Sequence, residues 1–266
     1  MNAESLRWET LCTTVEQTYQ VFRHYKLTGP ICCEMSDRVL VPEGVPLRQR
    51  GMQDFERYQG KAITTLGTVE DYKHFLPRLI EMNCAQQRRR TVFRDTITCE
   101  ELMAVGIGLD MIAMKLEYAQ ASLWPSAERD VLEALGIARW WWELTVPANY
   151  HGGIREAMAV LTAVGRPLCE CLSRMFASAG DAEFLGLSRF VNGSVTSSVK
   201  CPVPRFKWAS DRSDRGDQLE RWLLSPEVET ALEAAFFRAT EADAAEELSN
   251  AVQNLRWLRQ STVKFS

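Results

Sequence analysis

The sequence predicts an all-α protein, a single multi-helix domain with bundle or orthogonal packing and little or no sheet. Apolar residues recur at three- and four-residue steps along most of the 266 residues. Capping residues and prolines mark the ends of several of these segments. No segment shows the sustained alternation typical of a half-buried strand, and the short run Val39–Val41 is the best candidate for one isolated strand.

The expected helices follow one another along almost the whole chain. Their ranges are 4–24, 52–65, 69–83, 98–120, 126–145, 154–163, 166–178, 181–190, 217–224, 226–239 and 241–260. Residues 27–51 and 192–216 are rich in turn-forming residues and are expected to be loops. The economical interpretation is one domain over residues 1–266, in which the second loop precedes a C-terminal helical hairpin at about 217–260.

The helix at 69–83 has the clearest start signal. Thr68 occupies an N-cap position, and Asp71 three residues later completes an approximate capping box. Apolar residues then form one stripe along the helix. They are Tyr72, Phe75, Leu76, Leu79 and Ile80. Pro77 falls inside this pattern and should remove one backbone hydrogen bond and kink the helix about one turn earlier.

Two later helices also carry start signals. Ser225 is followed by Pro226 at the first helical position, and Thr240 with Asp243 repeats the capping-box spacing. In the last helix the apolar residues alternate four and three apart, which makes a seam for packing on a neighbouring helix. These residues are Ala244, Leu248, Ala251, Leu255 and Leu258.

Composition and charge exclude several classes of protein. The net charge of −4 argues against a general nucleic-acid binder, which usually has an excess of basic residues. The first twenty residues lack a basic segment followed by an apolar run, so no signal peptide is expected. No run of about eighteen apolar residues occurs, so no membrane span is expected. The sequence therefore predicts a cytoplasmic protein.

The eight cysteines lack the spacing of a zinc site or a redox dithiol. They are Cys12, Cys32, Cys33, Cys84, Cys99, Cys169, Cys171 and Cys201. Cysteine inside a helix usually behaves as a small buried hydrophobic residue. Reduced free thiols are therefore the favoured interpretation. A zinc site that draws on Cys32, Cys33 and a distant histidine is the alternative.

Glu70, Asp71 and His74 can share one helix face because residues three and four apart are neighbours. Such a set could bind a metal or carry out general acid–base chemistry. A working site needs more ligands, however, and His24 and His151 are the only other histidines. Capping already explains Asp71. The sequence also lacks a phosphate-binding loop, a nucleophile elbow and an HExxH motif, so it predicts no catalytic residue, metal ligand or cofactor.

Trp140, Trp141 and Trp142 are consecutive, and on a helix they cannot all face one core. At least two of them are expected to be buried. An exposed tryptophan would be a natural anchor for a partner, because tryptophan is enriched among the residues that dominate binding energy.

Charge is distributed unevenly along the chain. Between Pro226 and Ser249, seven acids against the single base Arg238 give a local net charge of −6. Arg88, Arg89, Arg90 and Arg94 show the opposite bias. Both runs could be solvated helix faces. The sharper interpretation is an acidic surface that meets a basic partner. Its candidate binding residues are Glu229, Glu233, Glu241, Asp243, Glu246 and Glu247.

One part of the chain carries a family resemblance. It consists of the pair Cys32-Cys33, the segment PLRQRGMQDFERYQGKAITTLGTVEDYKHFLPRLIEM from Pro46 to Met82, and a later group. The later group is Leu116, Tyr118, Ala119, Trp124 and Pro125. This pattern, over roughly residues 30–126, resembles a family of bacterial immunity proteins encoded beside toxins of contact-dependent or type VI secretion systems. Its most specific part is His74 to Arg78, whereas the cysteine spacing departs from the family pattern.

The resemblance implies a protein of interbacterial competition that binds and neutralises a cognate toxin and is not an enzyme. A cytoplasmic location makes a nuclease the expected class of toxin, because nucleases act in the cytoplasm. Their phosphate-binding surfaces are basic and would suit an acidic partner. No nucleic-acid or membrane partner is expected, and a homodimer stays open. The runner-up is a helical metal-dependent hydrolase centred on Asp71 and His74.

Overall fold

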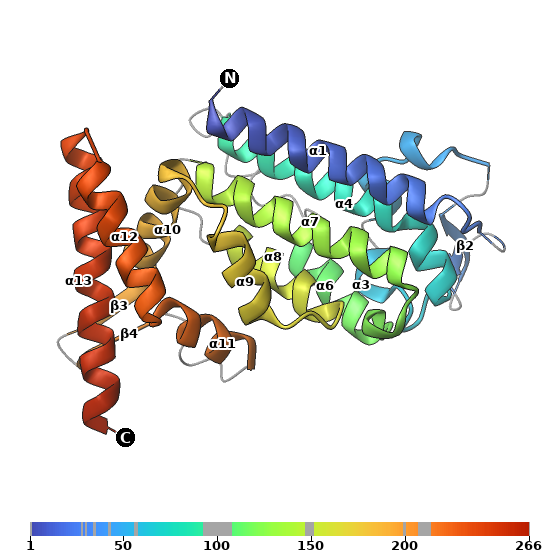
Figure 1. The fold of residues 1–266 in the computed structure, drawn as a ribbon. Coiled ribbons are helices and arrows are strands. Elements are labelled where there is room, and N and C mark those ends of the chain that lie inside the picture. Colours follow the sequence, from blue (N-terminus) through green and yellow to red (C-terminus); the bar gives the residue numbers. More distant parts are fainter. Residues whose placement is uncertain are drawn as a thin grey trace. The chain divides into compact units, whose positions relative to one another are not determined.

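The computed structural model describes residues 2–27, 29, 31–33, 36–41, 44–55, 58–92, 108–146, 152–198, 201–206 and 214–265. Helices dominate these residues, so the predicted all-α class is confirmed (Figure 1). None of the described helices combines the length and the apolar character that crossing a lipid bilayer requires.

The chain divides into two compact units. The first consists of Met1–Arg7, Arg139–Met158 and Pro167–Ser266, and the second of Trp8–Ala138 and Ala159–Arg166. The helices α1 (Ala3–Phe22), α7 (Ser126–Thr145) and α8 (Gly152–Ala163) each contribute residues to both units. Three of the four boundaries fall inside these helices, and the fourth lies between Arg166 and Pro167 in the connection from α8 to α9. The prediction of one domain over residues 1–266 stays a prediction.

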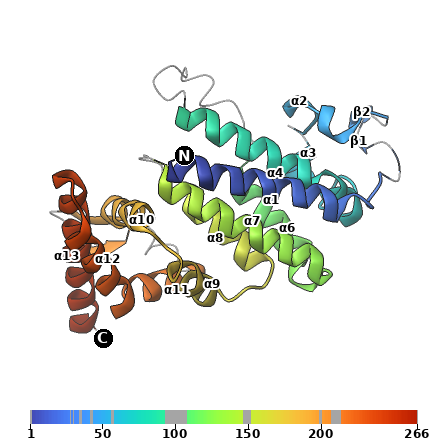
Figure 2. The same ribbon diagram turned by 45° about the horizontal axis from the view of Figure 1, so that its top comes forward.

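The second unit contains most of the N-terminal elements. Besides its parts of α1, α7 and α8, these are β1 (Ile31–Cys33), β2 (Ser36–Val41), η1 (Leu47–Gln49), α2 (Met52–Phe55), α3 (Tyr58–Lys61), α4 (Val69–Val92), α6 (Leu109–Tyr118) and η2 (Ala121–Leu123). Helices α1 and α4 lie side by side (Figures 1 and 2). The core includes a group of aromatic rings in which Phe75 meets Tyr58 and Phe55 edge to face, with ring centroids 5.1 and 5.4 Å apart.

The capping box predicted for α4 is present. The backbone N–H and the hydroxyl of Thr68 donate to Asp71 Oδ2 at 2.9 and 3.0 Å, and the backbone N–H of Asp71 donates to Thr68 Oγ1 at 3.2 Å. The helix continues through Pro77 to Val92, well beyond the predicted end at residue 83.

The prediction of one helix at 52–65 is wrong. The structure has the short helices α2 and α3 there, followed by a turn in which Ile63 adopts a left-handed φ of 68°. The Ile63 N–H donates to the Leu66 carbonyl at 2.9 Å and closes this turn just before α4. Of the helix predicted at 98–120, the described part is α6, and residues 98–107 lie outside the described residues.

The first unit contains the C-terminal elements. Besides its parts of α1, α7 and α8, these are α9 (Leu168–Phe176), α10 (Asp181–Ser194), β3 (Val195–Ser198), β4 (Cys201–Phe206), α11 (Asp214–Leu223), α12 (Pro226–Arg238) and α13 (Ala242–Phe265). Helix α10 approaches α7 closely at Gly186, where an added Cβ would lie 1.7 Å from the Leu144 carbonyl oxygen. Glycine is required there because the two backbones meet.

All three consecutive tryptophans are buried, at 2%, 7% and 0% exposure for Trp140, Trp141 and Trp142. Trp140 meets Trp222 edge to face, with ring centroids 6.1 Å apart, and the Arg7 guanidinium lies 4.8 Å from the Trp141 ring. The expectation that at least two are buried is confirmed, and none of them is an exposed anchor.

The two segments expected to be loops each contain an antiparallel β-hairpin. Strands β1 and β2 pair Ile31 with Val41 and Cys32 with Val39, so the candidate strand Val39–Val41 is real and the loop predicted at 27–51 is too long. The loop predicted at 192–216 is also wrong in its first part. There α10 continues to Ser194, and β3 pairs with β4 from Val195–Phe206 to Ser198–Cys201.

Two prolines explain why the second hairpin was not predicted. Pro202 and Pro204 lie in β4 and cannot donate backbone hydrogen bonds, which argues against a central strand. Both strands of a two-stranded hairpin are edge strands, where proline is tolerated. Residues 207–213 of the predicted loop lie outside the described residues.

Candidate functional site

The acidic C-terminal segment forms the predicted hairpin, in which α12 and α13 lie side by side (Figures 1 and 2). Helix α13 packs on α12 and α10 through its buried seam. The predicted seam residues Leu248, Ala251, Leu255 and Leu258 are all buried. Pro226 is the first residue of α12, as predicted, although the Ser225 hydroxyl makes no capping hydrogen bond.

Two of the candidate binding residues hold the hairpin together. Glu229 pairs with Arg256 Nε at 2.7 Å and with Arg259 Nη1 at 2.6 Å, and Glu233 also pairs with Arg256. Burial would raise the pKa of Glu229, but the hydrogen bonds from Arg256 and Arg259 outweigh it, so its pKa lies below the ordinary value. Glu229 and Glu233 therefore form ion pairs within the protein, between α12 and α13. We call the pairs of these two acids with Arg256 and Arg259 the ion-pair ladder.

A third candidate, Glu247, also has an internal partner. The Asn192 side chain on α10 donates to Glu247 Oε2 at 2.8 Å and to its backbone carbonyl at 2.9 Å. Asn254 Nδ2 in turn donates to Asn192 Oδ1 at 2.9 Å. Glu247 therefore helps to fix α13 on α10 and is less suited to bind another protein.

The remaining candidates Glu241, Asp243 and Glu246 are exposed and have no basic partner among the described residues. Asp243 and Glu246 begin a row of exposed side chains along α13, spaced three and four residues apart on the side opposite the buried seam. We call this row the outer stripe. It consists of Asp243, Glu246, Asn250, Gln253 and Trp257.

Trp257 gives the outer stripe an aromatic end, with 44% of its surface exposed. Phe237, at the end of α12 just before the turn to α13, is 82% exposed. The sequence-based prediction did not include either residue, because it rested on local charge and on the three consecutive tryptophans. Helical spacing could have identified Trp257, because it continues the series of residues three and four positions apart that starts at Asp243.

The second predicted site, at Asp71 and His74, has structural roles. Asp71 is 3% exposed, and its carboxylate forms the cap of α4. His74 Nδ1 lies 3.0 Å from the Tyr25 carbonyl oxygen, which is a hydrogen bond from the ring N–H to the backbone. Burial, together with the charges of Arg50 and Lys26, lowers the pKa of His74 despite this hydrogen bond. Among the described residues, no group of three or more His, Cys, Asp or Glu side chains could hold a metal ion.

Of the cysteines, Cys12, Cys84, Cys169 and Cys171 form no disulfide bond, which agrees with the prediction of reduced thiols. The described residues do not include the side chains of Cys32, Cys33, Cys99 and Cys201. The alternative of a zinc site at Cys32 and Cys33 therefore lies outside the described residues. In the basic run, the Arg88 guanidinium lies 4.4 Å from the Trp8 ring. The side chains of Arg89, Arg90 and Arg94 lie outside the described residues.

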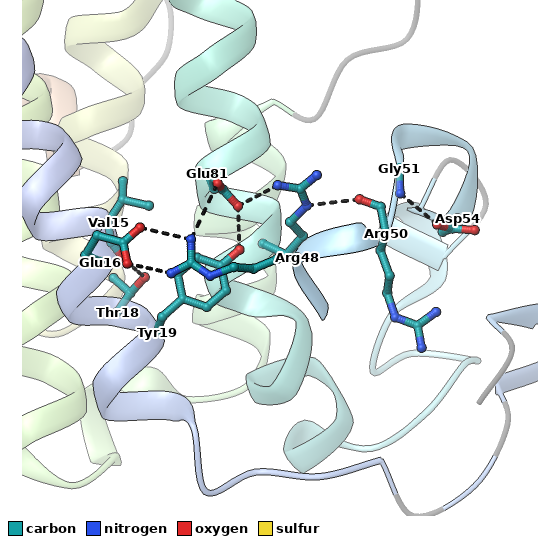
Figure 3. Close-up of polar contacts among 10 residues, drawn as sticks. Val15, Glu16, Thr18, Tyr19, Arg48, Arg50, Gly51, Asp54 and Glu81 are labelled. Atoms are coloured by element: carbon teal, nitrogen blue, oxygen red, sulfur yellow. Dashed lines mark hydrogen bonds and ion pairs between the residues drawn. The ribbon is translucent and has the colours of Figure 1, made fainter. Parts of the chain in front are cut away.

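A polar network joins α1, α4 and η1 in the second unit (Figure 3). Glu81 accepts hydrogen bonds from the Tyr19 hydroxyl at 2.5 Å and from Arg78 Nη1 at 2.6 Å. Arg48 pairs with Glu16 at 2.5 Å, and its guanidinium lies 3.8 Å from the Tyr19 ring. Burial and the hydrogen bond to Glu81 raise the pKa of Tyr19, so this hydroxyl stays protonated.

Comparison of the chain with protein-family models, with curated proteins and with solved structures found no match. Its function must therefore be inferred from its own surfaces and contacts.

Proposed function

We propose that this protein is an immunity protein that neutralises a cognate antibacterial toxin by binding it through the outer stripe of α13. The observation that carries the proposal is the exposed Trp257 on one helix face with the exposed acids Asp243 and Glu246. An aromatic anchor beside unpaired charges is a common composition for a protein-binding surface. The resemblance of residues 30–126 to immunity proteins supports the same function.

Charge indicates the kind of toxin surface that fits. Three exposed acids without a basic partner among the described residues, Glu241, Asp243 and Glu246, suit a basic partner. A nuclease must present such a basic surface to bind phosphates. Binding there would cover the substrate site of the toxin. A nuclease that acts on nucleic acid in the cytoplasm would place the complex in that compartment.

The acids and the aromatic residue should contribute differently. Exposed charges mainly accelerate association, and their effect fades as salt screens them. A buried tryptophan anchor mainly slows dissociation. The two contributions can therefore be separated by kinetics.

The test begins with the protein encoded by the gene next to the one for this chain. That protein should stop growth when it is expressed alone in a bacterial host, and co-expression of this chain should restore growth. The purified pair should form a stable complex. A neighbouring product that does not stop growth, or that does not bind this chain, would contradict the proposal.

Variants of the outer stripe then locate the interface. Trp257→Ala should increase the dissociation rate at least about tenfold, which corresponds to the loss of about 1.4 kcal/mol. Glu246→Lys should slow association at low ionic strength and have little effect at about 0.5 M salt. Leu123→Ala and Glu170→Lys change an exposed apolar residue and an exposed acid elsewhere, and they serve as matched controls. Equal kinetics for stripe and control variants would exclude this face.

A further inference from the structure

A cleft of the second unit has a volume of about 580 Å³, within the size range of small-molecule sites. It lies between the end of α1, the segment that follows it, residues 44–50 and helix α4. Its walls combine positive charge with aromatic rings.

Apart from two tyrosines, the ionisable residues that line this cleft in the described part of the chain are all basic. Arg23 and Lys26 are exposed, His74 is half-buried, and Arg50 contributes to the wall although it is only 1% exposed. No aspartate or glutamate is among the described residues that line the cleft. A concave site with one sign of charge concentrates ions of the opposite sign.

Three carboxylates of the same unit are engaged with partners outside the cleft or with tyrosine hydroxyls. Glu81 accepts hydrogen bonds from Tyr19 and Arg78, and Glu16 pairs with Arg48 (Figure 3). Glu128 accepts a hydrogen bond from the Tyr25 hydroxyl at 2.6 Å and pairs with Lys73 at 2.7 Å. These contacts offset the three acids within their own clusters. Asp71 and Asp54 act on His74 and Arg50 and reduce the positive charge of the cleft in part.

His74 has one ring nitrogen left for a ligand. Its Nδ1–H donates to the Tyr25 carbonyl, so in the neutral ring Nε2 is a hydrogen-bond acceptor. Figure 3 shows that the Arg50 guanidinium points away from the polar network around Glu81. The charges of Arg50 and Lys26 act on His74, which places the three groups near one another. An anion in the cleft would be attracted by the two cations, Arg50 and Lys26.

Aromatic side chains supply the rest of the wall. Tyr19 and Tyr25 line the cleft beside the basic residues. Their hydroxyls are turned to Glu81 and Glu128. Arg48 lies over the Tyr19 ring and His24 packs on the Tyr25 ring, so a ligand would contact the parts of the two rings that these neighbours leave uncovered. A flat ring packs well on such surfaces.

We propose that this cleft binds a small organic phosphate of about nucleotide size. The phosphate lies at Arg23 and Lys26, with Arg50 adding positive charge behind the wall, and the flat part of the ligand packs against Tyr19 and Tyr25. His74 Nε2 accepts a hydrogen bond from a donor group of the ligand. This inference is independent of toxin binding, because it concerns residues of the second unit, whereas the outer stripe belongs to the first.

The test is isothermal titration calorimetry of the full chain with three probes: adenosine 5′-monophosphate, adenosine and inorganic phosphate. The nucleotide should bind with a Kd at least about tenfold lower than either part alone, since it engages both the charge and the rings. Sodium benzoate serves as an organic carboxylate of similar flatness. Tighter binding of benzoate than of the nucleotide would overturn the phosphate assignment.

Variants of the cleft then test whether Lys26 and Arg23 contact the nucleotide. Lys26→Gln and Arg23→Gln change exposed side chains and should leave the circular dichroism spectrum unchanged. Each should raise the Kd for the nucleotide at least about fivefold. Lys61→Gln removes an exposed lysine outside the cleft and should not change the Kd. The proposal fails if the nucleotide binds no better than adenosine, or if the cleft variants bind it as well as Lys61→Gln does.

Discussion

Glu229 on α12 accepts a hydrogen bond from Arg256 Nε on α13 at 2.7 Å, across the interface of the two hairpin helices. The same carboxylate pairs with Arg259. The acidic hairpin therefore has two kinds of acid. Some hold its helices together, and others, such as Glu246, face outward along the outer stripe.

We expect Glu229→Gln to lower the free energy of unfolding by about 1 kcal/mol, because it weakens two ion pairs at a partly buried site. Glu246→Gln should change it by less than about 0.5 kcal/mol, since that side chain is exposed and has no basic partner among the described residues. Urea denaturation followed by circular dichroism measures both. Equal effects of the two changes would show that the ladder does not stabilise the hairpin.

Local charge could not predict which acids hold the two helices together and which face outward. The basic partners of these acids, Arg256 and Arg259, lie outside the acidic segment from Pro226 to Ser249. Pairing between residues 27 positions apart depends on how the helices pack, which local spacing does not reveal. The outer stripe, in contrast, follows from helical periodicity alone.

The same difference, between contacts local in sequence and contacts that depend on packing, explains which other features could be predicted. The cap at Thr68 and the seam of α13 were predictable because both depend on residues three to seven apart. The hairpin β3–β4 was not, because prolines obscure its strand pattern. The cleft was also hidden, since its basic residues Arg23, Arg50 and His74 are far apart in sequence and meet only in the folded unit.

The capping box at the start of α4 gives a second prediction. Thr68→Ala removes the hydroxyl that accepts from the Asp71 N–H, and it should lower the free energy of unfolding by about 1 kcal/mol. Thr65→Ala, at an exposed position in the preceding turn, is the matched control and should have little effect. Urea denaturation of the two variants compares them directly. A Thr68→Ala protein as stable as the control variant would contradict the capping role.

The buried pair of Lys73 and Glu128 gives a third prediction. Their charged atoms lie 2.7 Å apart, and Lys73 Nζ also donates to the Tyr25 hydroxyl at 2.9 Å and lies 4.2 Å from the Trp124 ring. Lys73→Met would leave a carboxylate buried without its cation, at a cost of about 3–5 kcal/mol. The double variant Lys73→Met/Glu128→Gln should be more stable than Lys73→Met alone.

A double-mutant cycle by urea denaturation measures this coupling. The four proteins are the parent, each single variant and the double variant. If the effects of the single changes simply add, the two side chains do not interact, and the proximity of their charges has no energetic consequence.

The last prediction concerns pH and His74. Burial and the positive charges of Arg50 and Lys26 lower its pKa below the ordinary value of 6.5, although the Tyr25 carbonyl and Asp71 on the same helix act in the opposite direction. The unfolded chain therefore binds a proton at this histidine more readily than the folded chain. By linkage, the contribution of His74 to the free energy of unfolding falls as the pH drops below about 6.5, and it levels off below the pKa of the folded state.

His74→Gln removes this titration and keeps a side chain that can donate to the Tyr25 carbonyl. The difference in free energy of unfolding between parent and variant should therefore change as the pH falls below about 6.5, with the parent losing stability relative to the variant. Urea denaturation at a series of pH values measures it, and the other titrating groups largely cancel in the difference. A difference that is constant over this range would mean that His74 titrates alike in the folded and unfolded chain. A difference of opposite slope would mean that the folded protein favours the imidazolium.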